Sequence, residues 1–170
     1  MICIADEVAV RLIDFVDRRD IDWAIQRALA ATPASPGSDP ARVTPTEACQ
    51  RQVLQYFHGQ RLTFDFPLAQ PGTPFQHRCW NALQRIPFGQ TQTYTQQTLT
   101  FAALTSLRAV AQANAHNFCA IVIPCHRVIG TSGDLRGYGG GIERKRWLID
   151  HERAIVQGVA AIPSTLFAAR

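Results

Sequence analysis

The first part of the chain opens with an alternation of apolar and polar residues. This alternation runs over 8–16 and predicts a strand. The period then changes over 20–30 to that of an amphipathic helix, with Asp20 at the position of an N-cap. The apolar face of that helix consists of Ile21, Ile25, Ala28 and Leu29.

The segment 32–46 interrupts the pattern, because it contains four prolines and no apolar period, which indicates a linker or an exposed loop. A second helix is predicted over 47–57 and ends at Gly59, and 62–66 alternates as a second strand. These elements describe a small α+β unit over 1–70.

The pattern becomes mostly helical in the second part. Thr73 and Gln76 have the spacing of a capping box, and Pro74 occupies the first helical position. The helix that they begin is stopped by Pro87 and Gly89. Its apolar stripe consists of Phe75, Cys79, Leu83 and Ile86.

Two short helices over 94–101 and 107–116 follow, with Thr105 and Ser106 as the cap of the second, which predicts a helix-turn-helix. The second helix carries Arg108 near its start. Its other side chains are mostly small, because every second residue from 109 to 115 is alanine: Ala109, Ala111, Ala113 and Ala115. Such small residues allow a backbone to approach closely, in soluble proteins most often to another helix.

The most unusual stretch is AIVIPCHRVIG over 120–130. Four apolar residues predict a buried strand that ends at Pro124, and Cys125, His126 and Arg127 follow at once. A glycine-rich loop over 131–141 and a last helix over 142–152 come next. Tyr138 lies within that loop, and the helix presents Ile142, Leu148 and Ile149 on its apolar face.

Composition and charge restrict the class of protein. The chain has 170 residues, 46% of them hydrophobic, enough for one sizeable core or for a main domain and a small companion. Residues 71–170 hold ten basic and four acidic side chains, whereas 1–70 hold seven and nine, so the net charge of +4 arises in the second part. This basic part favours a nucleic-acid partner. No apolar run is long enough to cross a bilayer and no basic leader is evident, so we expect a cytoplasmic protein.

The five cysteines are odd in number and show no CxxC spacing, so we expect free thiols. Cys3, Cys49 and His58 do not form a convincing ligand set for zinc. A zinc site on Cys119, Cys125 and His126 has irregular spacing, and we expect no metal.

Cys125 is the strongest candidate for chemistry. A thiol reacts as a thiolate, and adjacent His126 can take its proton if a third group, for which Glu152 is a candidate, holds the imidazole. A lone cysteine at a strand end is more often simply buried. Two other readings are a lesion-binding module without chemistry and a cysteine hydrolase with a Cys-His-Glu triad; the hydrolase predicts turnover and no need for Arg108.

These motifs resemble those of the O6-alkylguanine-DNA alkyltransferases. The likeness rests on IPCHRVIG, GTPFQHRCW, IPFGQTQTY, RAVAQANAHN and GYGGGIERKRWLIDHE, and it covers about residues 72 to 152. The form found as the C-terminal half of the bacterial adaptive-response protein is most similar, because it shares Arg-Ala-Val-Ala.

The resemblance implies a role for each catalytic residue. Cys125 is expected to accept the alkyl group once and irreversibly, activated by His126 through a water, with Glu152 orienting that histidine. Tyr94 is expected to donate a proton to guanine N3, and Asn117 to bridge the recognition helix and the cysteine loop. No cofactor is implied.

The resemblance also implies a monomer that binds double-stranded DNA carrying O6-alkylguanine through its minor groove and flips the damaged base. Arg108 is expected to fill the space that the base leaves. The other expected DNA contacts are Ala109, Ala111, Tyr94, Thr95 and Thr131. The expected pocket for the base is formed by Val128, Tyr138, Gly139 and Gly140.

The fold implied is α+β, with a ribonuclease-H-like N-terminal domain over 1–70 and a mostly helical, winged-helix-like domain with the helix-turn-helix over 72–170. The family's first domain usually opens with a hairpin. Because only one strand is evident before residue 20, we expect that domain to be shortened. The turn FAALTS lacks the usual Gly and Pro, Ala111 stands where Gly is common, and Phe118 stands where Pro is common.

Overall fold

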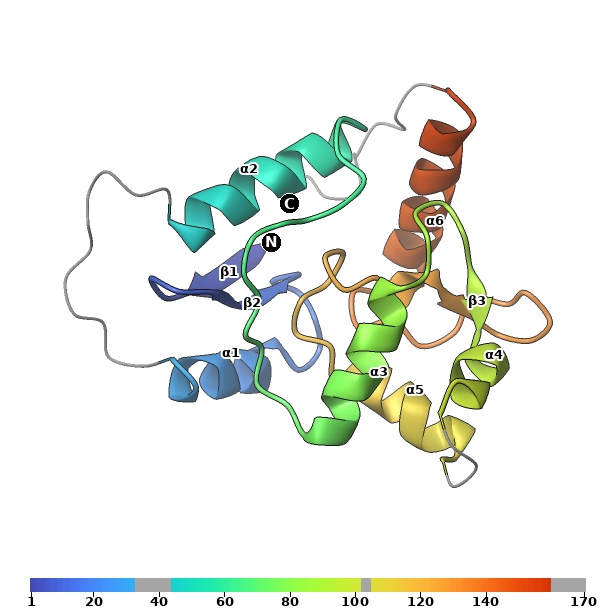
Figure 1. The fold of residues 1–170 in the computed structure, drawn as a ribbon, viewed down its shortest axis with the longest axis horizontal. Helices are drawn as coiled ribbons and strands as arrows, with labels where there is room; N and C mark the ends of the chain where they lie inside the picture. Colours follow the sequence, from blue (N-terminus) through green and yellow to red (C-terminus); the bar gives the residue numbers. More distant parts are fainter. Residues whose placement is uncertain (33–43, 102–104, 160–170) are drawn as a thin grey trace.

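The computed structural model describes residues 1–32, 44–101 and 105–159 (Figure 1). The predicted turn at 102–104 and most of the predicted loop at 32–46 lie outside the described residues. The elements in chain order are β1 (Ile2–Ala5), β2 (Val10–Asp14), α1 (Ile21–Ala30), α2 (Pro45–Phe57), α3 (Pro74–Gln84), β3 (Gln92–Thr93), α4 (Tyr94–Leu99), α5 (Leu107–Ala115), the 3-10 turn η1 (Cys125–Arg127), β4 (Val128–Ile129) and α6 (Ile142–Val156).

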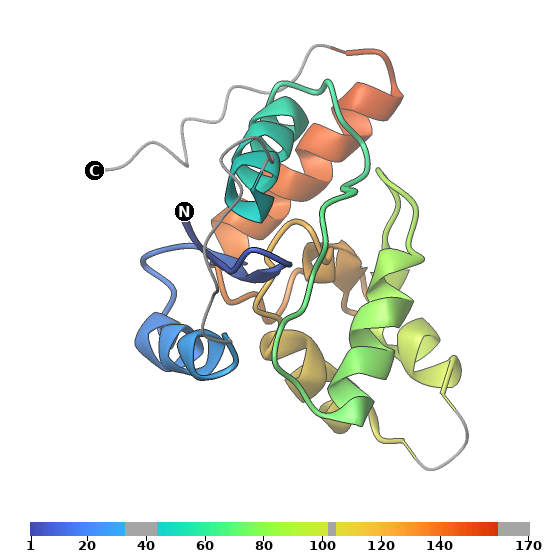
Figure 2. The same ribbon diagram turned by 60° about the vertical axis from the view of Figure 1, so that its left-hand side comes forward.

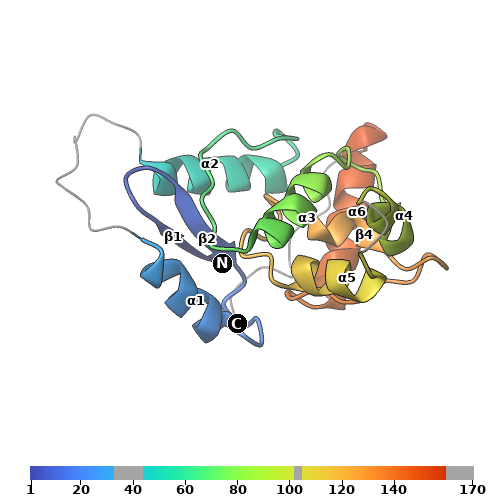
Figure 3. The same ribbon diagram turned by 60° about the horizontal axis from the view of Figure 1, so that its bottom comes forward.

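A hairpin of β1 and β2 forms the centre of the N-terminal part. The strands are antiparallel, with Cys3 opposite Ile13, and α1 and α2 cover opposite sides of the hairpin (Figures 1, 2 and 3). The predicted strand over 8–16 is therefore present as β2, but the expectation of a single strand is wrong. β1 escaped prediction because its four residues are all partly buried and lack a polar alternation.

The other edge of β2 contacts the chain just before the Cys-His-Arg stretch. Ile13 N donates to Phe118 O and Ala120 N donates to Ile13 O, both at 2.8 Å. A further bridge joins Val10 to Leu68. The hairpin thus fixes the segment that leads to Cys125 by backbone hydrogen bonds.

The C-terminal part is helical, as its sequence pattern predicts. Thr73 and Gln76 form the expected capping box at the start of α3, and the side chain of Ser106 accepts a hydrogen bond from Ala109 N at the start of α5. α5 packs against both α3 and α4, and the parallel pair β3–β4 joins the segment before α4 to the segment after Cys125.

The main hydrophobic core extends across both parts of the chain. It includes Val10, Leu12, Ala24, Val53, Trp80, Leu83, Phe118 and Val128. Because these residues come from both sides of position 71, the two predicted domains share one core, and the division at 70 to 72 stays a prediction. No helix among the described residues has the length and apolar character needed to cross a membrane.

Two predicted strands are absent, and the first helix differs in part from its prediction. Segment 62–66 forms no strand, because the bridge between this stretch of chain and β2 lies at Leu68, just beyond the segment. Segment 120–123 is buried but forms a turn, in which Ile123 N donates to Cys119 O at 2.8 Å. In the first helix Asp20 is the N-cap residue and Ala28 is buried, as predicted, but the Asp20 side chain makes no capping hydrogen bond and Leu29 is exposed.

Candidate active site

Cys125 lies at the start of η1, after a turn with an unusual backbone. Ile121 has φ of 72°, and it is the one non-glycine residue with positive φ among the described residues. A β-branched residue pays a steric cost in this conformation, and such strain is often found at functional sites. Cys125 N donates to Ile123 O at 2.8 Å, so the chain folds back tightly around Pro124.

Asn117 connects the end of α5 to the thiol. Its Nδ2 donates to Cys125 Sγ at 3.2 Å and to Ile123 O at 2.8 Å, and its Oδ1 accepts from Cys119 N at 2.9 Å. The side chain is 2% exposed, so both its donor and its acceptor are used inside the protein. The structure therefore brings these two predicted site residues into contact.

His126 and Glu152 are fully buried and hydrogen-bonded. His126 Nε2 lies 2.9 Å from Glu152 Oε1. An ionised carboxylate only accepts hydrogen bonds, so the proton is on Nε2 and Nδ1 of the neutral ring is free to accept one. Nδ1 is buried and makes no hydrogen bond to the described residues.

The Glu152 carboxylate is held by more groups than the sequence indicated. Arg127 donates from Nε and Nη2 at 2.8 and 2.9 Å, Tyr56 OH donates at 2.8 Å, and Gly89 N donates at 3.0 Å. Burial works to raise the pKa of Glu152, but the hydrogen bonds and charges of His126 and Arg127 lower it well below the ordinary range. The carboxylate is therefore ionised throughout the physiological pH range.

Burial has opposite effects on the thiol and the imidazole. It raises the pKa of the Cys125 thiol, and the hydrogen bond from Asn117 partly offsets this effect. It lowers the pKa of His126, against the pull of Glu152, so the imidazole is neutral and can act as a base. A thiol whose pKa is raised is protonated at neutral pH, so a base must remove its proton before it can react as a nucleophile.

Two tyrosines lie beside the thiol. Tyr94, at the start of α4, packs against the main core together with Cys125, and its hydroxyl donates to Gly137 O at 3.4 Å. Burial, followed by the charge of Cys125, raises the pKa of Tyr94 to about 12. The hydroxyl of Tyr138 is buried and makes no hydrogen bond to the described residues.

A small cavity opens at Cys125. It is lined by Asp14, Arg18, Asn114, Ala115, Asn117, Ala120, Cys125, Tyr138, Gly139 and Gly140. Three of the four predicted pocket residues lie nearby, whereas Val128 is fully buried in the core and does not line the cavity. The sequence pattern missed Asp14, Arg18, Tyr56 and Gly137, because nothing in their local sequence distinguishes them from ordinary surface or core positions.

The predicted DNA contacts lie on exposed parts of the helical unit. Arg108 is exposed at the start of α5, and Ala109 and Ala111 are partly buried on the same helix. Thr95 on α4 and Thr131 after β4 are exposed, and their hydroxyls are 3.3 Å apart. Gln97 and Asn114 exchange buried hydrogen bonds that hold α4 against α5, so this surface has a fixed shape.

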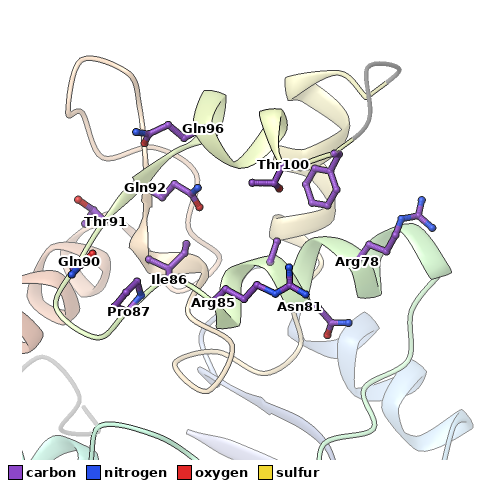
Figure 4. Close-up of a pocket in the computed structure, with 12 residues that line it drawn as sticks. Arg78, Asn81, Arg85, Ile86, Pro87, Gln90, Thr91, Gln92, Gln96 and Thr100 are labelled. Atoms are coloured by element: carbon purple, nitrogen blue, oxygen red, sulfur yellow. The ribbon is translucent and has the colours of Figure 1, made fainter.

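A second, larger cleft lies between α3 and the segment that runs from Ile86 to α4 (Figure 4). Its walls carry Arg78, Asn81, Arg85, Gln92, Gln96 and Thr100. No residue lines both this cleft and the cavity at Cys125, so the cleft is separate from the candidate active site. Among the described residues, no group of three or more metal-ligating side chains is placed to hold a metal ion.

A partly buried thiol held by an amide, next in the chain to a buried histidine–carboxylate pair, is an arrangement suited to a protein that uses a cysteine nucleophile. A family model described as the DNA-binding domain of 6-O-methylguanine DNA methyltransferase matches residues 74–154. The methylated-DNA–protein-cysteine methyltransferase of Mycobacterium tuberculosis is 50% identical over 103 residues, which cover 61% of this chain and 62% of that protein. The constitutive enzyme of the same name from Bacillus subtilis is 46% identical over 112 residues, covering 65% and 68%.

The likeness extends to solved structures. The crystal structure of Mycobacterium tuberculosis OGT in complex with DNA superposes with a TM-score of 0.71 at 34% identity, over 90% of this chain and 86% of that one. The chain belongs to the methylated-DNA–protein-cysteine methyltransferase family. The matched segment spans less than two thirds of the mycobacterial relative's length.

Proposed function

We propose that this protein repairs DNA by direct reversal, moving the alkyl group from O6 of guanine to Cys125. The observation that carries the proposal is the 3.2 Å hydrogen bond from Asn117 to the thiol of Cys125, whose neighbour in the chain, His126, forms a buried pair with Glu152. The family membership supports the substrate. We infer a single-turnover transferase without a cofactor, because the thioether product leaves no thiolate to react again.

The transfer begins with removal of the thiol proton. His126 Nδ1 takes this proton through a bound water, and Glu152 stabilises the imidazolium that forms. The thiolate attacks the alkyl carbon, the S–C bond forms and the C–O6 bond breaks, with the electron pair passing to the guanine ring. The hydrogen bond from Asn117 stabilises the thiolate before attack.

Tyr94 completes the proton balance. Its hydroxyl donates a proton to N3 of the guanine, so the base leaves neutral. The tyrosinate that remains takes up a proton from solvent while the His126 imidazolium releases the proton of the thiol, so the net reaction consumes no proton. A pKa of about 12 keeps the hydroxyl protonated until the base needs the proton, which suits an acid that acts once in each repair event.

Binding to duplex DNA uses the helix-turn-helix of α4 and α5. The thin start of α5, with Ala109 and Ala111, enters the minor groove, and Arg108 fills the space left by the flipped base. Thr95, Thr131 and Tyr94 contact the strand beside the lesion. The extruded base is held by the loop of Tyr138, Gly139 and Gly140, with Val128 behind it in the core.

The remaining features of the fold are assigned by the same likeness. We infer a ribonuclease-H-like domain over 1–70 and a winged-helix-like arrangement over 72–170, in a monomer that works in the cytoplasm. The hairpin, which supports the turn before Cys125, is the observation that favours a structural role for the first of these domains.

Intact-protein mass spectrometry tests the proposed function. The protein is mixed with a duplex containing one O6-methylguanine, and the products are mapped by peptide. We expect a gain of about one methylene mass on the peptide that holds Cys125, limited to one equivalent. Cys125→Ala and an unmethylated duplex serve as controls. An unchanged mass with DNA still bound would instead indicate a lesion binder.

A further inference from the structure

We propose that Arg18 is a positioning residue for the acceptor thiol, acting from the N-terminal part through the end of α5 and Asn117. This inference deepens the proposed function and rests on it. Arg18 stands in the short connection between β2 and α1, about a hundred residues before Asn117, so only the tertiary structure brings the two together.

The guanidinium of Arg18 binds two backbone carbonyls at the end of the recognition helix. Its Nη2 donates to Ala115 O at 2.7 Å and its Nη1 donates to Asn117 O at 2.8 Å. The last carbonyls of a helix have no partner within that helix, and a cation there also matches the helix dipole. Arg18 is therefore a cap for α5 supplied by a distant part of the chain.

Arg18 is itself held in one position. It forms ion pairs with Asp14 at the end of β2 and, at 2.6 Å, with Asp20 before α1. The residue is 5% exposed, and a planar guanidinium that is paired on two sides has little freedom to move. Through the ion pair with Asp14, the position of the hairpin determines the position of Arg18 and hence of the carbonyls of Ala115 and Asn117.

The link from these carbonyls to the thiol is short. The side chain of Asn117, whose own carbonyl Arg18 holds, donates to Cys125 Sγ at 3.2 Å. Arg18 and Cys125 also line the same cavity. A shift of the Asn117 backbone would therefore lengthen the hydrogen bond that stabilises the thiolate.

Arg18 also supports the loop that we assign to the base pocket. A Cβ atom at Gly139 would lie 3.2 Å from Cζ and Nε of Arg18, closer than most such contacts. The guanidinium thus forms the floor beneath this glycine. Arg18 therefore contacts both sides of the proposed pocket: Asn117 on the side of the thiol and Gly139 on the side of the loop.

The test requires a variant that does not leave a buried unpaired charge. Arg18→Met alone would leave the buried Asp14 carboxylate without its partner. The main variant is therefore Asp14→Asn combined with Arg18→Met, which removes both charges. The charged groups that act on the Cys125 thiol are Asp14, Lys145 and Arg18, of which Asp14 raises its pKa and the other two lower it. Removing Asp14 and Arg18 together cancels much of their direct effect, and what remains reports the hydrogen bond from Asn117.

The experiment measures the rate of Cys125 alkylation by iodoacetamide against pH, without DNA, and the rate of transfer from free O6-benzylguanine. We expect the alkylation midpoint of the double variant to move to higher pH and the transfer rate to fall about tenfold, as for loss of one hydrogen bond to a charged group. The control is Asp6→Asn with Arg11→Met, which removes another ion pair of the same hairpin. Arg11 also donates to a backbone carbonyl, that of Ala69, but neither Asp6 nor Arg11 lines the cavity.

An alkylation profile and a transfer rate that both match the wild type would overturn the inference. If the double variant does not fold, Arg18→Lys decides the question, because an ammonium keeps the charge but cannot span both carbonyls in the same geometry. We expect a smaller shift in the same direction, and no shift would refute the role. Failure of the proposed function has a separate signature, since the wild type would then accept no alkyl group while the iodoacetamide profiles could still be compared.

Discussion

The hydroxyl of Tyr56 on α2 donates a 2.8 Å hydrogen bond to Oε1 of Glu152 on α6, across 96 residues of sequence. The same oxygen accepts from His126, so a helix of the N-terminal part contributes directly to the histidine–carboxylate pair. Tyr56 is fully buried, and burial together with the Glu152 charge raises the pKa of its phenol well above 10, so it remains a donor. The candidate active site is thus supported by both parts of the chain.

Glu152→Gln should destabilise the protein at pH 7 by about 3–5 kcal/mol, because it leaves Arg127 buried without its carboxylate. The folded pKa of Glu152 lies below its ordinary 4.5, so its stabilising contribution is present above pH 4.5 and is lost as the pH falls below that value. The difference in unfolding free energy between wild type and variant should therefore shrink as the pH is lowered from 5 to 3.

Urea unfolding at several pH values measures this effect. Glu143→Gln is the matched control, because Glu143 is an exposed glutamate in the first turn of the same helix. We expect a change below about 0.5 kcal/mol for that control. A constant difference between wild type and Glu152→Gln from pH 7 to pH 3 would contradict the buried ionised carboxylate.

Arg108→Ala should slow repair of methylated duplex DNA by about 10²-fold, since an arginine that fills the vacated space offsets the few kcal/mol needed to flip a base. Reaction with free O6-benzylguanine should be unchanged, because no base has to leave a stack. Arg51→Ala, which removes an exposed arginine of α2, controls for the loss of one positive charge. Equal losses on duplex and free base would rule out the flipping role.

Tyr94→Phe should reduce the rate of methyl transfer by about 10²-fold, the lower range for loss of a general acid. Because the aromatic ring is kept, the unfolding midpoint should stay near wild type, and the affinity for unmethylated duplex should fall by less than the transfer rate, since the variant removes only the hydroxyl of this proposed DNA contact. Single-turnover kinetics and a binding titration together separate the two effects. A variant that transfers methyl at the wild-type rate would assign the proton donor elsewhere.

Gly140→Ala should destabilise the protein by about 1–3 kcal/mol through overpacking. A Cβ atom at this position would lie 2.4 Å from Cδ2 of Phe15, an aromatic ring that packs against Tyr138. A Cβ atom at Gly133 would have no atom within 4 Å, but the φ of this residue is +83°. Gly133→Ala therefore measures the cost of backbone strain alone, about 1–2 kcal/mol. Thermal melting of both variants should place Gly140→Ala lower, and the reverse order would show that Phe15 yields to the added methyl group.

Local sequence chemistry determined the helices of the C-terminal part. The capping box of Thr73 and Gln76 and the cap at Ser106 are decided by residues within four positions of one another, so they can be read without the fold. The Pro-Cys-His-Arg motif likewise predicted the family and singled out Cys125, the thiol that we propose as the acceptor. The sequence pattern also indicated the pairing of His126 with Glu152, which the structure confirms at 2.9 Å.

Only the tertiary structure decided which distant groups hold that motif in place. β1 was missed because its sequence has no alternating pattern. It is a strand because it pairs with β2. The apolar run 120–123 was predicted as a strand, but hydrogen bonds to β2 and a left-handed Ile121 make it a turn. Tyr56 and Arg18 reach the site from far away in the chain. They have their roles because they are buried among partners from other elements, and no local sequence pattern encodes those partners.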